Sequence, residues 1–324
     1  MNPHDNSRFA EFKIVSKIYK VIEEHSLEVN ILYINPTVPS PAPRPVLFRL
    51  HGGGLVGGSS LCPPFFAPWI LQLAKKHNAV IISPDYRLIP ESTVQNALDD
   101  VHDCWAWTHQ SLPRLLEVET GIRLDLGKVF TTGDSAGGYL AIQLALSYPD
   151  EMQAVQVSYP LVDVERTNVE PRLDESVFDQ PPYPRATFEQ HVARMRQAEH
   201  ETGRKAVVSK DDMLSRADIM WTFVQHGLAS QFFPKDQRTL FPFYRLQDGA
   251  RLSRGGLVVW HAEGDSVVKV EASYRLQELL TKLDPELNFR LDVRDGEHGF
   301  DHYVSIDDAW VSESLKGIVA SWLG

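Results

Sequence analysis

The sequence has only two cysteines, Cys62 and Cys104, among 324 residues. Two cysteines cannot build a disulfide framework, and two free buried thiols are favoured over a single bridge. Long apolar runs are also missing, since none approaches the roughly 18 residues that a membrane-spanning helix needs. The first residues lack the apolar core of a secretory signal. We therefore expect a cytoplasmic protein without a membrane span.

Positive charge is scarce as well, with 32 Lys and Arg against 43 Asp and Glu and a formal net charge of −11. Nucleic-acid binding relies on clustered Lys and Arg that displace counterions from phosphates. The few basic stretches are short, and Arg194-Met195-Arg196 is an example. Such stretches are typical of a solvated helix face, so no nucleic-acid partner is expected.

Apolar runs that are typical of buried strands alternate along the chain with helical patterns. Strands are predicted at 26–34, 45–50, 79–83, 129–132, 154–158, 256–260 and 289–293. Helices are predicted at 66–77, 94–110, 138–147, 270–282 and 309–322. This alternation predicts an α/β fold whose mostly parallel central sheet has helices on both faces, with 26–34 as an antiparallel edge strand. The length fits one domain, residues 1–324, with its active site at the carboxyl ends of the strands.

Residues 163–234 interrupt this alternation because they contain no good strand pattern. Two amphipathic helical patterns follow a Pro-rich loop there. Their apolar faces contain Phe188, Val192 and Met195 in the first and Leu214, Ala217, Trp221 and Val224 in the second. We expect an inserted helical cap, to which residues 1–25 could contribute, and favour packing of these faces on the body over lining of a substrate pocket. The Pro-rich stretch 36–45 predicts an extended linker.

Ser135 lies in Gly133-Asp134-Ser135-Ala136-Gly137, directly between a predicted strand and a predicted helix. A serine nucleophile on such a sharp turn needs small residues two positions before and after it, so that strand and helix can approach. Gly133 and Gly137 meet that need. The following helix adds partial positive charge and a free N–H, that of Ala136. We predict that Ser135 is a nucleophile.

Three glycines in His51-Gly52-Gly53-Gly54 follow a predicted strand upstream of this motif. They allow the backbone to turn its N–H groups toward one point. The N–H groups of Gly53 and Gly54, with that of Ala136, would form an oxyanion hole for a tetrahedral intermediate. A flexible loop or a phosphate cradle is the alternative, but no Lys-Ser/Thr follows as it would in a P-loop.

The general base is predicted to be His298, which follows the last predicted strand and has Gly296 and Gly299 close to it. The chain order of nucleophile, acid and base in hydrolases of this kind requires a late histidine. His302 lies four residues further on, and a His-x-x-x-His pair could indicate a metal. No third ligand is evident, and no Glu follows the first His as in metalloproteases, so no metal is expected.

The acid is predicted to be Asp265, which follows the predicted strand 256–260 in Glu263-Gly264-Asp265. A carboxylate at this position would hold His298 in the right tautomer and stabilise its imidazolium form. Glu263 is the nearest rival, but it lies closer to the strand and before the glycine turn.

Together these motifs resemble the hormone-sensitive-lipase-like esterases. The resemblance is carried by His51-Gly52-Gly53-Gly54, Gly133-Asp134-Ser135-Ala136-Gly137-Gly138, Asp265, His298-Gly299-Phe300 and Asp85-Tyr86-Arg87-Leu88-Ile89-Pro90-Glu91. It implies the α/β-hydrolase fold and covers the chain from about Pro45 onward except the cap. From the residues alone, the Asp85–Glu91 segment is a turn after a core strand with Arg and Glu available to pair.

The sequence departs from the family pattern at two places. Leu55 follows the glycines where the family usually has an aromatic residue, which could reshape the pocket beside the oxyanion hole. Ser92-Thr93-Val94 replaces the usual His-Pro-x-Pro. Leu55 and Phe300, the latter in the matched His298 motif, are candidates for substrate contact.

We therefore predict hydrolysis of a small or medium-sized carboxylic ester through an acyl-enzyme on Ser135, with no metal or organic cofactor. A tailoring hydrolase, lactonase or dehydratase of a natural-product pathway is an alternative on the same site. Relatives that dehydrate can carry Thr at the nucleophile position, so Ser135 favours hydrolysis. A small-molecule receptor like the plant gibberellin receptors is a further alternative, which the presence of His298 disfavours. The acyl group, the alcohol group and the oligomeric state are left open.

Overall fold

The computed structural model describes residues 6–35, 42–166, 170–173 and 176–324. Most of the predicted linker 36–45 therefore lies outside the described residues. The described part contains an eight-stranded sheet with the strand order β1-β2-β4-β3-β5-β6-β7-β8. Its strands are β1 (Lys13–Ile22), β2 (His25–Tyr33), β3 (Arg44–Leu50), β4 (Val80–Pro84), β5 (Leu124–Asp134), β6 (Ala154–Ser158), β7 (Leu257–Ala262) and β8 (Phe289–Arg294). Strands β3 to β8 pair in parallel, which confirms the predicted mostly parallel sheet.

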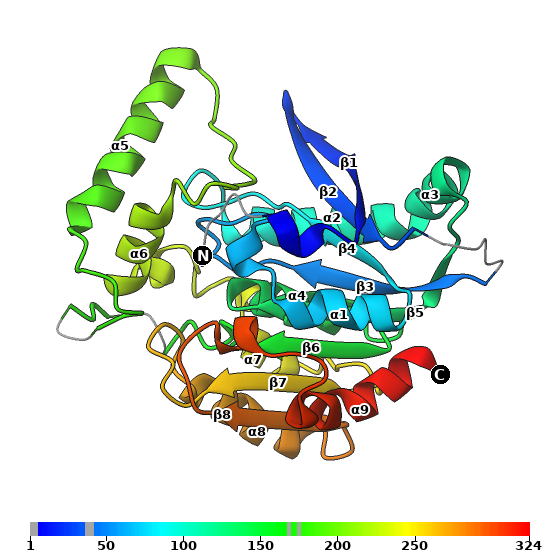
Figure 1. Cartoon of the computed structure of the whole chain (residues 1–324). Helices are drawn as coiled ribbons and strands as arrows, with labels where there is room; N and C mark the ends of the chain where they lie inside the picture. The colour runs from blue at the N-terminus through cyan, green and yellow to red at the C-terminus, as the bar shows by residue number, and fades with distance from the viewer. Residues whose placement is uncertain (1–5, 36–41, 167–169, 174–175) are drawn as a thin grey trace.

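Helices cover both faces of this sheet, as predicted (Figure 1). One hydrophobic core contains side chains of α1 (Pro68–Lys76) and α9 (Ala309–Leu323). The other contains side chains of α2 (Val94–Gln110), α3 (Leu112–Thr120), α4 (Ala136–Ser147) and α8 (Glu271–Leu283). The two cores lie on opposite faces because side chains of a strand alternate between them, as Leu47 and Phe48 of β3 do.

The start of α2 gives a local reason for one departure from the family pattern. Thr93 caps the helix with its hydroxyl, which accepts a hydrogen bond from the Asn96 N–H at 3.1 Å. The Asn96 side chain in turn accepts from the Thr93 N–H at 3.2 Å. This capping box starts the helix at Val94, the residue that the sequence pattern predicts.

The prediction that residues 26–34 form an edge strand is wrong. β2 pairs with β4 on one side and with β1 on the other, and β1 is the edge. The tip of this β1–β2 hairpin contacts the inserted segment, since Glu24 pairs with Arg204 at 2.8 Å and His25 Nε2 lies 2.8 Å from Ser209 Oγ. The other described residues before 25 include β1 and the buried Phe9 and Phe12 of the core.

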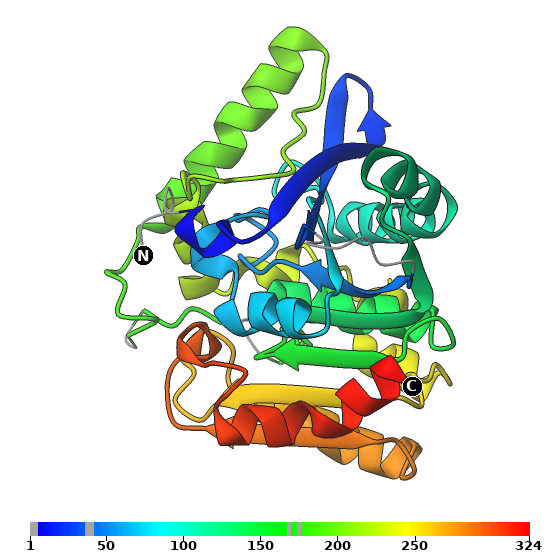
Figure 2. The ribbon, with the colours of Figure 1, turned by 45° about the vertical axis from the view of Figure 1, so that its right-hand side comes forward.

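The segment between β6 and β7 contains the helices α5 (Arg185–Thr202), α6 (Ala217–Gln225) and α7 (Pro242–Gln247). Figures 1 and 2 show α5 and α6 beyond the ends toward which the parallel strands point. These are the carboxyl ends of the strands, the edge at which α/β sheets hold their ligands. The inserted helices therefore lie at the functional edge of the sheet.

Both cysteines are buried and free, which confirms the prediction of two buried thiols. Burial raises the pKa of the Cys62 thiol to about 12, so this thiol is protonated at neutral pH. Among the described residues, no helix has the length and apolarity that crossing a membrane requires.

Candidate active site

Ser135 occupies the sharp turn between β5 and α4, with φ 54° and ψ −118°. The turn is possible because its flanking glycines have no side chains. A Cβ on Gly133 would lie 2.2 Å from the carbonyl oxygen of Gly137, and one on Gly137 would lie 2.2 Å from that of Leu50. The Ser135 N–H donates to the Ser158 carbonyl oxygen at the end of β6, at 2.9 Å. These contacts hold the hydroxyl at the carboxyl edge of the sheet.

The glycine loop after β3 curls back beside this turn. Gly53 and Gly54 both have positive φ, 102° and 65°, and the Gly53 carbonyl oxygen accepts from the Gly57 N–H at 2.9 Å. Gly53, Gly54 and Ser135 line one cavity. Ala136 begins α4, where an N–H has no carbonyl of its own helix to bond. The glycine loop and the serine turn thus share one cavity wall, and Ala136 follows Ser135 directly at the start of α4.

His51, the residue before the three glycines, holds this loop through contacts with Tyr86. Its ring is fully buried and stacks on the Tyr86 ring, with centroids 4.2 Å apart. The Tyr86 hydroxyl donates to the His51 carbonyl oxygen at 2.6 Å. Burial and the nearby Arg49 charge lower the pKa of His51 to about 3, so this histidine is neutral and structural.

Asp265 and His298 form a direct pair, with Asp265 Oδ2 2.8 Å from His298 Nδ1. The other carboxylate oxygen accepts from the Val267 and Val268 N–H groups at 2.9 and 2.8 Å. Burial alone would raise the pKa of Asp265, but the charge of His298 and the side-chain hydrogen bonds from His261 and His298 hold it well below its ordinary value. Burial opposes charge on His298 too, yet the Asp265 carboxylate raises the pKa of His298 above its ordinary 6.5. Glu263, the rival acid, is exposed and accepts from the Tyr274 hydroxyl instead.

The loop that carries Asp265 is held by side chains from two other segments. Glu297 Oε1 accepts from the Ser266 N–H at 2.7 Å and from the His298 N–H at 2.6 Å. Arg172, from the inserted segment, donates to the Ser266 carbonyl oxygen at 2.6 Å. Glu297 thus ties the acid loop to the histidine loop, and Arg172 ties it to the insertion.

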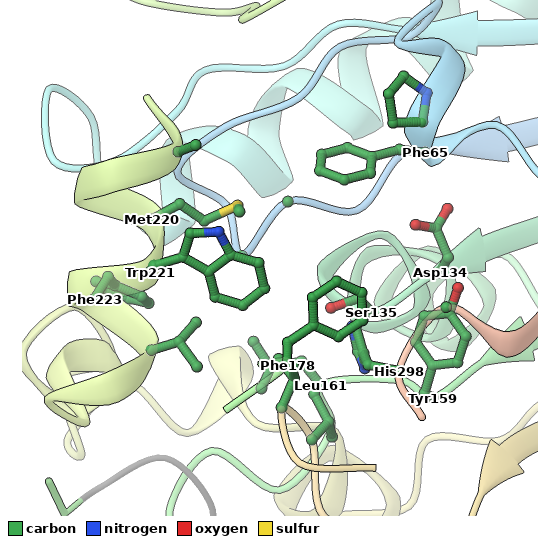
Figure 3. Close-up of a pocket in the computed structure, with 18 of the residues that line it drawn as sticks. Phe65, Asp134, Ser135, Tyr159, Leu161, Phe178, Met220, Trp221, Phe223 and His298 are labelled. Carbon is green, nitrogen blue, oxygen red and sulfur yellow. The ribbon is translucent and has the colours of Figure 1, made fainter. Parts of the chain in front are cut away.

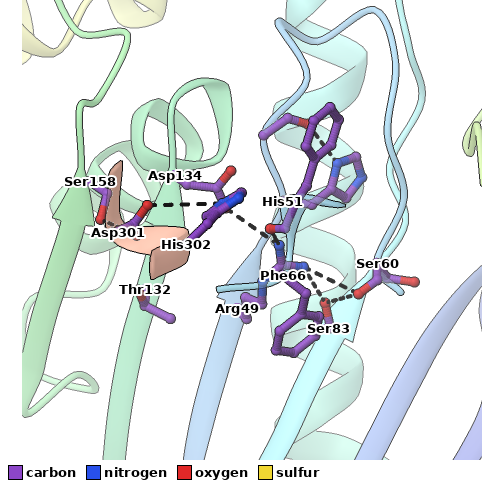
Figure 4. Close-up of polar contacts among 12 residues, drawn as sticks. Arg49, His51, Ser60, Phe66, Ser83, Thr132, Asp134, Ser158, Asp301 and His302 are labelled. Carbon is purple, nitrogen blue, oxygen red and sulfur yellow. Dashed lines mark hydrogen bonds and ion pairs between the residues drawn. The ribbon is translucent and has the colours of Figure 1, made fainter. Parts of the chain in front are cut away.

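A fully buried arginine, Arg49, lies behind the serine turn (Figure 4). It pairs with Asp134 at 3.4 Å and donates to the Ser60 carbonyl oxygen at 3.2 Å, and its guanidinium lies over the Phe66 ring. Burial raises the pKa of Asp134 to about 7, against the opposing charge of Arg49. Arg49 was not predicted as a site residue from the sequence, although a charged residue in the apolar strand before the glycine loop is a signal of a buried polar contact.

The cavity in front of Ser135 has a volume of about 310 Å³. Figure 3 shows Ser135 and His298 on one side of it and Met220 and Trp221 of α6 on the other. Eight lining residues come from the inserted stretch 163–234: Phe178, Leu214, Ala217, Met220, Trp221, Phe223, Val224 and Ala229. The Phe178 ring stacks on the Trp221 ring, with centroids 5.4 Å apart and planes at 16°. The wall opposite the serine is therefore apolar and partly aromatic.

The structure corrects the expectation for the two amphipathic faces of the insertion. The second face lines the cavity, since Leu214, Ala217, Trp221 and Val224 all contribute to its wall. The first face packs as predicted, with Phe188 buried in the main core. Leu214 precedes α6 with φ 51° and is not part of the helix.

The two residues predicted to contact substrate do not line the cavity in the part of the chain that is described. Leu55 is fully buried in the core that contains side chains of α2, α3, α4 and α8. Its positive φ of 64° turns its side chain away from the direction that an extended chain would give. Phe300 begins a short turn after Gly299 and packs between Tyr159 and Trp310, at centroid distances of 6.2 and 6.3 Å. His302 and Tyr303 of that turn line the cavity instead.

Arg87 and Glu91 of the Asp85–Glu91 segment pair with other residues. Arg87 forms a two-oxygen pair with Asp100 of α2. Glu91 accepts from Arg216, the residue before α6, with both carboxylate oxygens at 2.7 and 3.0 Å, and it lies 2.8 Å from His191 of α5. Glu91 therefore joins α5 and the start of α6 to the body.

Within residues 6–35, 42–166, 170–173 and 176–324 there is no group of three or more His, Cys, Asp or Glu that could hold a metal ion. Ser135 and His298 line the same cavity, and His298 is bonded to Asp265.

This fold and this arrangement define an α/β hydrolase. The chain belongs to the family described as alpha/beta hydrolase fold, whose family model matches residues 47–227. The matched stretch contains the glycine loop, the serine turn and the inserted helices α5 and α6.

Similar proteins span the whole chain or parts of it. Probable carboxylesterase M8 of Phoma sp. is 29% identical over 325 residues, which cover 98% of each chain. The non-reducing polyketide synthase pkbA of Emericella nidulans is 32% identical over 197 residues, which cover 57% of this chain and only 7% of that much longer one. A Pyrobaculum calidifontis esterase has the same fold, with a TM-score of 0.59, 22% identity and coverage of 99% of this chain and 88% of the other.

Proposed function

We propose that this protein is a carboxylic ester hydrolase that works through a serine nucleophile, Ser135. The observation that carries the proposal is the cavity, which Ser135 shares with His298, itself bonded to Asp265 at 2.8 Å. The full-length similarity to probable carboxylesterase M8 of Phoma sp. supports ester hydrolysis. The motifs quoted above further support membership of the hormone-sensitive-lipase-like esterases, with residues 163–234 acting as a cap.

The tautomer of His298 follows from its partner. Asp265 is ionised and can only accept, so Nδ1 of His298 carries the proton and Nε2 keeps its lone pair. In the mechanism, Ser135 Oγ attacks the ester carbonyl carbon while His298 Nε2 takes the hydroxyl proton. His298 then gives this proton to the departing alkoxide, which leaves as the alcohol and leaves the acyl group on Ser135. A water, deprotonated by His298, attacks the acyl-enzyme and releases the carboxylic acid and the free serine.

The negative charge of each tetrahedral intermediate would rest on the N–H groups of Gly53, Gly54 and Ala136. These groups are fixed by the loop and by the start of α4, so they need no reorganisation when the charge develops. Loss of one such donor typically costs about 3 kcal/mol of transition-state stabilisation.

The substrate class follows from the cavity wall. Trp221, Met220 and the other lining side chains of the inserted segment are apolar. A charged group would lose its hydration there without gaining a partner. We therefore propose that the group opposite Ser135 is uncharged and apolar.

Replacement of the nucleophile tests the proposed function. Ser135→Ala should abolish hydrolysis of p-nitrophenyl butyrate by several orders of magnitude, because no attacking hydroxyl remains. Ser147→Ala, at the last residue of α4, is the matched control and should keep wild-type turnover. The unmutated protein should also form a stoichiometric covalent adduct with a fluorophosphonate at Ser135. Turnover retained in Ser135→Ala would overturn the assignment, and tight ligand binding without any turnover would support a receptor instead.

The apolar wall can be tested separately with Trp221→Ala. Removal of the indole enlarges the cavity next to Phe178 and takes away one half of the stacked pair. We expect kcat/KM to shift toward longer acyl chains in a p-nitrophenyl ester series. Trp107→Ala, in a partly buried position of α2, is the control and should leave the chain-length profile unchanged. An identical profile for both variants would contradict the proposed wall.

A second candidate function is hydrolysis of an acyl ester or thioester made by a polyketide synthase. The observation that favours it is the similarity of 57% of this chain to the synthase pkbA. The same attack on an acyl carbon releases a thiol instead of an alcohol. Matched alkyl esters and N-acetylcysteamine thioesters of one aromatic acyl group would separate the two candidates by their kcat/KM ratio.

A further inference from the structure

A second histidine, His261, lies against the acid of the proposed triad. It is fully buried in β7, four residues before Asp265. Its Nε2 is 3.3 Å from Asp265 Oδ2 and 2.8 Å from the Val268 carbonyl oxygen. Its Nδ1 is 2.7 Å from the Ser273 hydroxyl of α8. Both ring nitrogens therefore have partners, although no water can reach the ring.

These partners fix the proton on the His261 ring. Nε2 faces a carbonyl oxygen and a carboxylate whose pKa is held low, and both can only accept. Nε2 must therefore carry a proton. Nδ1 then has no proton and accepts a hydrogen bond from the Ser273 hydroxyl.

The consequence is that Asp265 Oδ2 faces two imidazole N–H groups. One comes from His298 at 2.8 Å and the other from His261 at 3.3 Å. Oδ1 is occupied by two backbone N–H groups. Among these four donors, His261 belongs to strand β7, whereas Val267, Val268 and His298 belong to loops.

We propose that His261 is a positioning residue for the triad acid, and the inference rests on the proposed function. As a neutral donor it holds Oδ2 in the direction of His298 Nδ1 and spreads the negative charge of Asp265 over a second N–H. Without it, the carboxylate would be a stronger base toward His298 alone, so His298 would hold its proton to higher pH. His261 does not touch the substrate and acts only through Asp265.

The test compares His261→Leu, which removes the donor at similar volume, with His261→Gln, whose Nε2 can replace the imidazole N–H. We expect His261→Leu to lower kcat by roughly ten- to a hundredfold, the effect of one hydrogen bond to a charged group, with little change in KM. The acid limb of its pH profile should move to higher pH. His261→Gln should recover most of the rate and the wild-type limb.

The low-field proton resonance of His298 Nδ1–H gives a readout that a merely structural role would not move. It should shift in His261→Leu and return in His261→Gln. Ser273→Ala is a milder probe, because it leaves the ring in place and removes only the hydroxyl that bonds Nδ1, so the ring is held less firmly against Asp265 Oδ2. If His261→Leu does not fold, the acid limb of Ser273→Ala decides, and a limb at the wild-type pH overturns the inference.

Equal losses in the Leu and Gln variants, or folded variants with unchanged kcat and an unmoved limb, would also overturn it. Failure of the proposed function looks different, because Ser135→Ala would then retain turnover or the unmutated protein would show none. Loss of turnover in Ser135→Ala together with an unaffected His261→Leu would sink only the role of His261.

Discussion

The substitution Asp265→Asn is the sharpest test of the charge arrangement, because it changes one atom type and almost no volume. Every neighbour of this carboxylate is a donor. Val267 and Val268 give their N–H groups to Oδ1, and His298 and His261 lie against Oδ2. An asparagine has one oxygen and one NH2 group, so one pair of donors must face another donor.

The backbone pair decides which way the amide points. The N–H groups of Val267 and Val268 cannot change their protonation, whereas an imidazole can move its proton to the other ring nitrogen. The amide oxygen therefore takes the backbone side, and the NH2 group faces His298 Nδ1. His298 must then accept at Nδ1 and carry its proton on Nε2, where it cannot take the proton of Ser135.

The expected loss follows from this wrong tautomer. In the serine-protease triad the same change costs about 10⁴-fold in kcat, which corresponds to about 5 kcal/mol at the transition state. We expect a loss of this size in kcat/KM for p-nitrophenyl butyrate, with a melting temperature that shows the variant is folded. Residual turnover above the uncatalysed rate should remain, because the oxyanion donors are untouched.

Glu263→Gln is the matched control. Glu263 lies two residues before Asp265 but is exposed, and the contact described for its side chain is with the Tyr274 hydroxyl. Its neutralisation should leave kcat/KM unchanged. If Asp265→Asn kept kcat/KM within about tenfold of wild type, or if the control lost as much, the tautomer argument would be refuted.

Three further outcomes are expected. The raised pKa of His298 means that its neutral, proton-accepting form is lost early on acidification, so kcat/KM should fall below a midpoint higher than 6.5; a midpoint under 6.5 would argue against the Asp265 pair. Gly137→Ala should destabilise the fold by about 1–3 kcal/mol in urea unfolding, because its Cβ would lie 2.2 Å from the Leu50 carbonyl oxygen. Burial raises the pKa of Asp85 to about 7, so the folded state binds a proton that the unfolded chain releases near pH 4; stability should fall as pH rises toward and through 7, and Asp85→Asn should flatten that dependence.

The parts of the site that the sequence predicted are those whose chemistry is local. The serine turn needs small residues two positions before and after it, and Gly133 and Gly137 can be recognised directly in the sequence. The strands from β3 onward were predictable for a similar reason, since runs such as Val80–Pro84 are buried along their whole length. The missed strand β1 has its apolar side chains on both faces, and Ile18 and Val21 are exposed, so neither a continuous nor an alternating pattern marks it.

The wrong predictions concern the directions of side chains, which neighbouring letters do not fix. Leu55 follows the glycines but points into the core because its backbone has positive φ. The second apolar face of the insertion has the same periodicity whether it packs or lines a cavity, so the pattern could not separate the two. The contacts of Arg49 and His261 could not be predicted from the sequence, because their partners Asp134 and Ser273 are 85 and 12 residues away.

The inserted segment cannot be treated as a binding surface alone. Arg172 donates to the carbonyl oxygens of Ser266 and Val267, and the Phe178 N–H donates to the Ser266 hydroxyl at 2.8 Å. Ser266 and Val267 follow Asp265 directly, so the cavity wall and the triad acid share one short loop. On the proposed mechanism, a substrate group that displaces Phe178 would pull on the loop that carries Asp265, so we expect substrate fit and proton transfer to be coupled through Phe178, Ser266 and Asp265. A change in the wall should therefore alter kcat together with KM wherever it moves Phe178, and KM alone where it touches only α6.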